Sequence, residues 1–159
     1  MTQTDRRSDE VTTPGFLHPS ARPLWRTPGA VVAAAGALLV AISYGLVWYR
    51  PDVDASVAIT GWGGASESGY DVDLSLLHLL PVLAVVLVVT IVVGLVCGRT
   101  IDETRPVAMV TVLSALSGAL VSLAVVPDGI SASGAGVYVA VVGCLVIAAG
   151  GALLTFVRR

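Results

Sequence analysis

The chain has 159 residues, of which 55% are hydrophobic and only 13% are charged, about half the charged share of an ordinary soluble domain. This composition, arranged in long uncharged apolar runs, predicts an integral membrane protein. A formal net charge of −2 argues against a nucleic-acid partner, and two cysteines, Cys97 and Cys144, are too few for a disulfide framework or a cysteine metal centre.

The first 28 residues are rich in Ser, Thr, Pro, Asp and Arg and show no sustained periodicity, which predicts a disordered cytoplasmic tail. All nine basic residues of the chain are Arg. Together with the abundance of Ala, Gly and Val, this usage is typical of a G+C-rich bacterial genome. We therefore expect the cytoplasmic (inner) membrane of a bacterium as the location.

The remainder, residues 29–157, is predicted to be one all-α integral membrane domain, a bundle of four transmembrane helices. A membrane-spanning helix needs about 20 apolar residues, and four uncharged runs reach that length. In lipid the backbone has to satisfy its own hydrogen bonds, so helix is expected even where Val dominates. The predicted spans are residues 29–48, 76–97, 107–126 and 135–157.

The arginines predict that both termini are cytoplasmic. Only Arg50 would lie on the outer side, whereas the other eight flank the inner ends of the spans, as the positive-inside rule requires: Arg6, Arg7, Arg22, Arg26, Arg99, Arg105, Arg158 and Arg159. Trp25, Trp48 and Tyr49 are expected to act as interface anchors of the first span. This span is longer than the apolar region of a cleaved signal peptide, so an uncleaved signal anchor is the preferred interpretation.

Residues 49–75 form the longest polar passage between the spans and are predicted to be a β-hairpin-like extracytoplasmic loop. Apolar and polar residues alternate over residues 53–60 and 70–75, as in two short strands, with a Gly-rich connection between them. Trp62 in that connection is expected to contact the membrane, the helix ends or a partner. Residues 98–106 and 127–134 are predicted to be short connections rich in turn residues.

The same loop carries the candidate contact residues. Asp52, Asp54, Asp71 and Asp73 would meet at the base of the hairpin, where carboxylates can bind a hard divalent cation. The simpler interpretation, which we prefer, is that these side chains keep the loop soluble, and no metal or cofactor is expected. His78 near the outer end of the second span is interpreted as a structural interface residue, with proton sensing as the alternative.

Small residues recur at every fourth position in three spans and predict faces where helix backbones approach closely. These positions are Gly29, Ala33, Ala37, Ala41 and Gly45 in the first span, Ser114, Gly118 and Ser122 in the third, and Gly136, Ala140, Cys144, Ala148 and Ala152 in the fourth. The second span is bulkier and is expected to face more lipid, with a possible kink at Pro81.

No span contains Asp, Glu, Lys or Arg, although proton and ion pathways commonly depend on such groups. The leading hypothesis is a non-enzymatic accessory or scaffold subunit that presents its outer loop to a membrane-protein partner or the cell envelope, or that forms a homo-oligomer. A component of a small transporter or channel, with Ser and Thr lining the path, is the second hypothesis. An outer-surface enzyme with His78 as its base comes third.

The four spans, the cytoplasmic Arg flanks and the Gly-Trp outer loop together resemble small uncharacterised four-helix membrane proteins of high-G+C bacteria. One such group is the tryptophan-operon-associated transmembrane proteins. The resemblance covers residues 29–157 and concerns topology: span count and a longer first outer loop. It implies a multi-pass membrane protein and assigns no functional residue.

Overall fold

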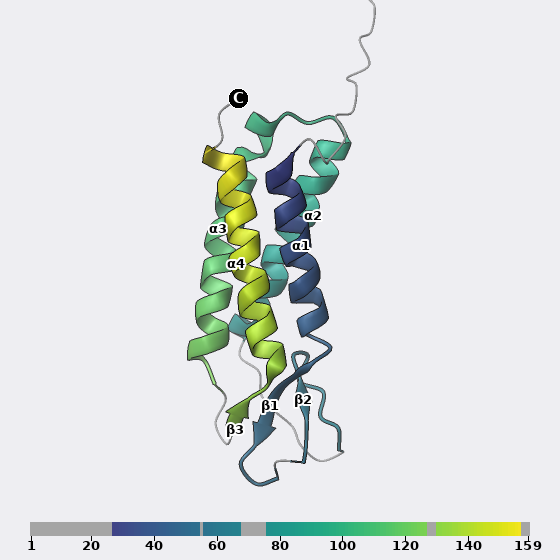
Figure 1. Cartoon of the computed structure of the whole chain (residues 1–159), viewed down its shortest axis with the longest axis vertical. Helices are drawn as coiled ribbons and strands as arrows, with labels where there is room; N and C mark the ends of the chain where they lie inside the picture. The colour runs from purple at the N-terminus through teal and green to yellow at the C-terminus, as the bar shows by residue number, and fades with distance from the viewer. Residues whose placement is uncertain (1–26, 55, 68–75, 127–129, 157–159) are drawn as a thin grey trace, which may run out of the picture.

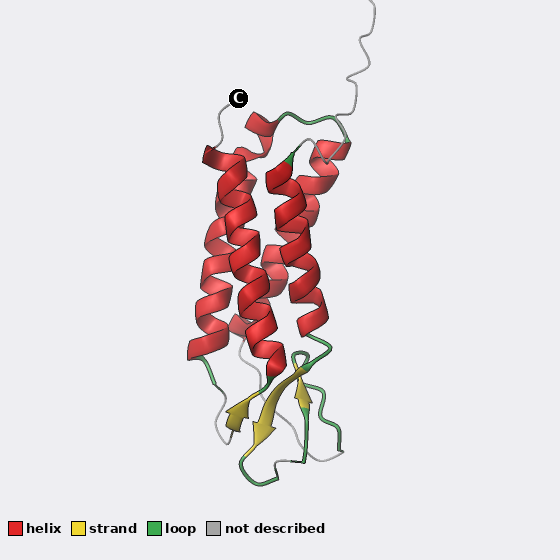
Figure 2. Ribbon diagram, viewed as in Figure 1, coloured by secondary structure: helices red, strands yellow, loops and turns green. Residues whose placement is uncertain are grey.

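The computed structural model describes residues 27–54, 56–67, 76–126 and 130–156. Within these residues the chain is mostly helical, as predicted, and the helices lie side by side with a small sheet at one end (Figures 1 and 2). We call that end the sheet end, and the other the Thr100 end. Most of the predicted tail and the predicted strand over residues 70–75 lie outside the described residues.

Four α-helices are present in the described parts of the chain: α1 (Pro28–Ser43), α2 (Leu80–Val96), α3 (Ile101–Ala124) and α4 (Ala135–Phe156). A 3₁₀ turn, η2 (Leu76–Leu79), leads into α2. By length and composition α3 and α4 are able to cross a membrane, whereas α1 and α2 are apolar but only 16 and 17 residues long. The structure thus gives two helices of spanning length where the sequence predicted four.

Helix α1 packs most closely on α4, and the contact depends on glycine. The two helices are antiparallel (Figure 1), with Gly29 opposite Gly150 and Gly36 opposite Gly143. A Cβ added to any of these four glycines would come within 2.7–2.9 Å of the carbonyl oxygen of its opposite residue. The absence of side chains therefore lets the two backbones meet, which is the packing that lipid-embedded helices favour.

The glycines of this contact are spaced by seven residues on both helices, not by four. A step of four residues turns about 400° around a helix, so a stripe of every fourth residue drifts off one face, whereas a seven-residue step nearly returns to it. Accordingly Gly29, Ala33 and Ala37 are buried, Ala41 is exposed, and Gly45 lies beyond the end of α1. The predicted stripe follows the contact for about half its length and then leaves it.

The predicted small-residue positions of the other two helices are mostly inside. In α4, Gly136, Ala140, Cys144 and Ala148 are buried and Ala152 is half-buried. In α3, Ser114, Gly118 and Ser122 are buried.

The start of α2 differs from the prediction. Pro81 was expected within a span, where it would kink the helix, but it stands in the first turn of α2. No intrahelical hydrogen bond is lost there, because the first amides of a helix have no partner within it. Pro81 packs against α3, where a Cβ on Gly118 would come 3.0 Å from the Pro81 nitrogen.

Helix α3 begins earlier than the predicted span, inside the predicted connection over residues 98–106. The Thr100 hydroxyl accepts a hydrogen bond from the Glu103 amide at 3.3 Å, and the Glu103 carboxylate accepts one from the Thr100 amide at 3.1 Å. This capping box satisfies two amides at the helix start. Arg105 forms an ion pair with Asp102 at 3.2 Å in the same turns.

At the sheet end, strand β1 (Val47–Pro51) lies between β2 (Ile59–Thr60) and β3 (Ile130–Ser133), and both pairings are antiparallel. β1 covers the last two residues of the predicted first span and the first three of the predicted outer loop, and β3 lies in the predicted connection before the last span. Only the last two residues of the predicted strand over residues 53–60 form β2. The sheet thus joins the two connections at this end of the helices. We call the three strands together with residues 52–54 and 56–67 the cap.

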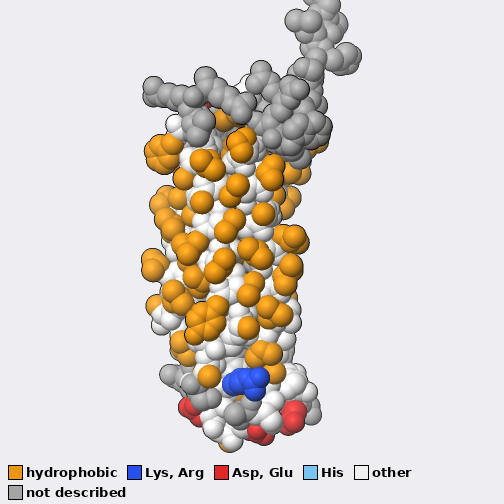
Figure 3. Space-filling view, viewed as in Figure 1, with side chains coloured by type: hydrophobic (Ala, Val, Ile, Leu, Met, Phe, Trp, Pro, Cys, Tyr) orange, Lys and Arg blue, Asp and Glu red, His pale blue; other side chains and the backbone are white. Residues whose placement is uncertain are grey.

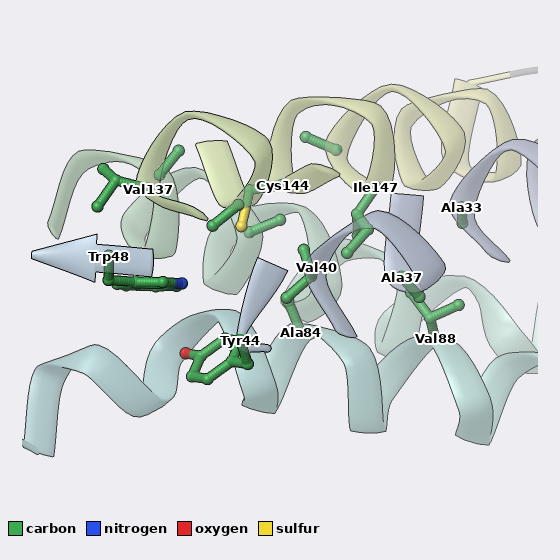
Figure 4. Close-up of a cluster of buried hydrophobic side chains, with 14 of the residues drawn as sticks. Ala33, Ala37, Val40, Tyr44, Trp48, Ala84, Val88, Val137, Cys144 and Ile147 are labelled. Atoms are coloured by element: carbon green, nitrogen blue, oxygen red, sulfur yellow. The ribbon is translucent and has the colours of Figure 1, made fainter. Parts of the chain in front are cut away.

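The interior runs from the helices into the cap without a break. One buried cluster reaches from Ala33 and Val88 to Trp48 and Tyr49 in β1 (Figure 4), and a smaller one lies around Ile91 toward the Thr100 end. On the face shown in Figure 3, hydrophobic side chains lie along the helices and acidic side chains gather at the sheet end.

Candidate functional site

Five ring-bearing side chains meet where the helices join the cap: Tyr44, Trp48, Tyr49, Trp62 and His78. We call them the aromatic cluster. Neighbouring ring centroids lie 4.8–6.3 Å apart with tilted or edge-to-face planes, the geometries that aromatic pairs prefer. All of them except Trp62 are buried.

Trp48 is the centre of this cluster and is completely buried. Its indole nitrogen donates a hydrogen bond to the Ser43 carbonyl oxygen at 2.7 Å, which satisfies a carbonyl at the C-terminal end of α1. Gly136 lies against the ring, and a Cβ there would come 2.7 Å from the same indole nitrogen. Trp48 therefore ties together the end of α1, the start of α4 and strand β1.

The sequence identified Trp48 and Tyr49 as interface anchors of the first span, and this prediction is wrong. Both side chains are wholly buried in the cap. The helix ends at Ser43, and after a turn the chain continues as strand β1, in which Trp48, Tyr49 and Pro51 are buried. Hydropathy alone does not separate the last turn of a span from a buried strand that follows it.

His78, a candidate contact residue, is buried rather than presented. The Tyr49 hydroxyl lies 2.9 Å from His78 Nε2, and the Tyr44 hydroxyl donates a hydrogen bond to the His78 carbonyl oxygen. Burial raises the pKa of Tyr49 above its ordinary value, so the hydroxyl stays protonated. His78 is thus held inside the cap by hydrogen bonds and does not face solvent.

Trp62 is the exposed member of the aromatic cluster, with 66% of its surface accessible. Its ring rests on Tyr44 at a centroid distance of 4.8 Å. Gly61 before it is buried against the rings of Trp48 and Tyr44, and a Cβ there would come 2.7 Å from the Trp48 indole nitrogen. Glycine at position 61 therefore places the turn, and Trp62 with it, directly on the buried rings.

The acidic candidates do not form a described metal site. Asp52 is exposed, and the Asp54 carboxylate accepts hydrogen bonds from the Ser56 amide at 2.9 Å and the Ser56 hydroxyl at 2.6 Å. These two bonds lower the pKa of Asp54. Asp71 and Asp73 lie outside the described residues. Among the residues that are described, no three His, Cys, Asp or Glu side chains stand close enough to hold a metal ion.

Several residues that shape this region were not singled out in the sequence. Tyr44 and Ser43 end α1, Gly61 places the Trp62 turn, and Gly134 donates its amide to the Trp48 carbonyl oxygen at 2.6 Å. Tyr44 and Trp48 stand four residues apart, a spacing that would signal neighbouring rings only in a helix. Their actual contact depends on the chain leaving the helix between them.

Comparisons with protein-family models, with curated proteins and with solved structures found no match to this chain.

Proposed function

We propose that this chain is a small multi-pass membrane protein whose four helices cross the bilayer and whose cap stands on the outer face. There it would act as a non-enzymatic accessory or scaffold subunit that presents the cap to a partner. The single observation that carries the proposal is a cap with acidic side chains on its surface, joined to the end of helices that all expose large apolar side chains.

The apolar surface supports membrane insertion. A soluble monomer rarely exposes a contiguous apolar patch of more than a few hundred Å². Large hydrophobic side chains point outward from all four helices here: Val31, Leu38 and Ile42 on α1, Leu83, Val86, Val89, Val93 and Val96 on α2, Met109, Val110, Leu113, Leu116, Leu120 and Leu123 on α3, and Val142, Leu145, Leu153 and Phe156 on α4.

The shorter helices are compatible with crossing. At 1.5 Å per residue α1 is about 24 Å long, a few Å short of a hydrocarbon core of about 30 Å. Local thinning of the bilayer accommodates such a difference at modest cost. The 3₁₀ turn Leu76–Leu79 adds length to α2 at the sheet end.

The distribution of charge supports the orientation. Arg99 and Arg105 flank the Thr100 end, whereas Arg50 alone among the described arginines belongs to the cap. Positive charge accumulates on the cytoplasmic side of membrane proteins. The Thr100 end, and with it both termini, would then be cytoplasmic.

Cysteine labelling tests this arrangement, because the chain offers its own reporter. Cys97 is exposed at the end of α2, and Cys144 is buried. A membrane-impermeant maleimide should label Cys97 only in inside-out vesicles. In a Cys97→Ala background, Glu67→Cys should be labelled from outside intact cells. Labelling of Glu67→Cys from the cytoplasmic side, or recovery of the chain as a soluble species without detergent, would refute the proposal.

The partner is tested by photo-crosslinking from the cap. Val53 is 88% exposed in the segment after β1, although Val is a hydrophobic residue. A photoreactive amino acid there should give a discrete protein adduct in native membranes. The same amino acid at Leu113, on the lipid-facing side of α3, serves as the control and should give none. Equal adducts from both sites, or none from Val53, would remove the support for a presented cap.

One observation favours the transporter alternative. Ser122 is buried in α3, and its hydroxyl has no hydrogen-bond partner within the described part of the chain. Most buried hydroxyls are instead satisfied by their own helix: Ser43 donates to Val40 at 2.6 Å and Thr111 to Val107 at 2.7 Å. Solute flux in liposomes above an empty-vesicle background, abolished by Ser122→Val, would favour this alternative.

A further inference from the structure

Trp62 combines two properties that seldom occur together: its side chain is largely exposed, and its position is fixed. The turn that carries it is closed by hydrogen bonds from the Thr60 amide to the Gly64 carbonyl and from the Gly63 amide to the Thr60 carbonyl, each 2.9 Å long. Gly63 adopts a φ of 81°, which non-glycine residues rarely do. The turn is therefore a defined support for the ring.

The contact with Tyr44 fixes how far the Trp62 ring lies from the end of the helices. The ring of Trp62 packs at a tilt against that of Tyr44, which directly follows the last residue of α1. Because α1 is only about 24 Å long, the residues just beyond its end still lie at the edge of a hydrocarbon core of about 30 Å. Trp62 is thereby held at the depth where hydrocarbon gives way to lipid headgroups.

A second aromatic side chain stands at the same end on another element. Tyr138, in the first turn of α4, is 58% exposed. Tyr and Trp are enriched at membrane–water interfaces because their apolar rings and polar tips suit opposite sides of that boundary. The indole N–H of an exposed tryptophan is a hydrogen-bond donor that suits a headgroup oxygen.

We propose that Trp62 is a lipid-binding residue that anchors the cap to the headgroup region of the outer leaflet. This inference rests on the proposed membrane location. Under this proposal Trp62 contacts lipid and does not contact the protein that binds the cap. The partner surface would then lie farther from the helices, on the side of the cap that carries Val53.

Tryptophan fluorescence tests the anchor in proteoliposomes of the full chain. The starting protein is Trp25→Phe, which keeps only Trp48 and Trp62, and Trp25→Phe/Trp62→Phe supplies the Trp48 signal for subtraction. The difference reports Trp62, because the two proteins differ only at that position. Vesicles contain phospholipid brominated either next to the headgroup or near the end of the acyl chain, and iodide probes access from water.

Bromine next to the headgroup should quench most of the Trp62 emission, bromine near the chain end should quench less, and iodide should quench little. Strong iodide quenching without bromine quenching would overturn the anchor, and so would protection from both, which would mean that protein covers Trp62. Flotation and resistance to alkaline extraction are measured on the same vesicles. Failure there would overturn the membrane proposal itself, whereas iodide quenching in floating vesicles would overturn the anchor alone.

A second readout replaces the fluorescence of the tryptophan by that of an attached dye. In a Cys97→Ala background, Trp62→Cys and Gly64→Cys are labelled with one environment-sensitive dye. Both sites belong to the same exposed turn, but a Cβ added at Gly64 would meet only the Thr60 hydroxyl and not the Tyr44 ring. The dye at position 62 should emit as in an apolar interface, and the dye at position 64 as in water. Identical emission from the two sites would contradict the anchor.

Discussion

Tyr49 and His78 are buried side by side, and the 2.9 Å hydrogen bond between them replaces one that water gives in the unfolded chain. Removing the hydroxyl leaves the His78 nitrogen without that partner in a place that water does not reach. Tyr49→Phe should therefore lower the free energy of unfolding by about 1–3 kcal/mol. Thermal unfolding in detergent near neutral pH, followed by near-ultraviolet circular dichroism, measures the loss.

Tyr49 also makes the stability of the protein depend on pH, in a direction that its raised pKa determines. Burial raises the pKa of Tyr49 in the folded protein, whereas the unfolded chain releases this proton near pH 10. Above about pH 10 the unfolded state thus binds fewer protons than the folded state, and stability falls as pH rises further. Tyr49→Phe should lose part of this alkaline decline, because the phenylalanine ring has no proton to release. An unchanged decline in Tyr49→Phe would contradict this account.

Where helices α1 and α4 meet, their glycines face each other, and there is no space for a methyl group between the two backbones. A Cβ on Gly36 would come 2.6 Å from the Ile147 amide nitrogen and 2.7 Å from the Gly143 carbonyl oxygen, both of them backbone atoms. Gly36→Ala should therefore destabilise the protein by about 1–3 kcal/mol.

The matched control is Gly45→Ala, because the nearest atom to its added Cβ is the Ile42 carbonyl oxygen at 3.5 Å. Denaturation of both variants in the same detergent gives the comparison. Equal stability of the two variants would show that α1 and α4 do not meet at Gly36.

The start of α3 offers a separate test. Thr100→Ala removes the hydroxyl that accepts the Glu103 amide and should cost about 1 kcal/mol, whereas Thr100→Ser keeps the acceptor and should cost much less. Hydrogen exchange at the first turn of α3 should accelerate in the alanine variant. If both variants exchange alike, the capping box contributes nothing to this helix end.

Sequence patterns predicted single elements better than the contacts between them. The last helix was expected over residues 135–157 and is found at Ala135–Phe156, because Gly134 and a change in composition mark its start. The capping box at Thr100 and Glu103 is also visible in the sequence, yet the connection there was predicted as a loop.

What the sequence did not reveal depends on partners far along the chain. Strand β3 is four residues long, and its partner β1 lies about eighty residues earlier, so no local pattern identifies either as a strand. The glycine contact was hidden for another reason. Small residues occupy several faces of α1 and α4, and only the antiparallel register selects Gly29, Gly36, Gly143 and Gly150 among them.

On the scale of the whole molecule, Gly134 joins the cap to the helices. It stands between β3 and α4, and its amide donates a hydrogen bond to the Trp48 carbonyl oxygen. A Cβ added to Gly134 would collide with the carbonyl group of Val47. Gly134→Ala should therefore separate β3 from β1 and loosen the cap, while α1–α4 stay packed.

Protease added to the outside of proteoliposomes should then cut the cap of Gly134→Ala faster than that of the unchanged chain. Gly64→Ala is the control, since its Cβ would meet only the Thr60 hydroxyl at 3.4 Å. Equal cleavage of the two variants would mean that the cap does not depend on the β1–β3 pairing.

The pairing of α1 with α4 has a consequence for how the molecule is made. During synthesis the first helix leaves the ribosome long before the last, so its glycines have no partner helix while the intervening chain is translated. Strand β1 waits in the same way for β3. Both long-distance contacts form only when residues 130–156 have emerged, so a nascent chain stopped before that point would lack both of them.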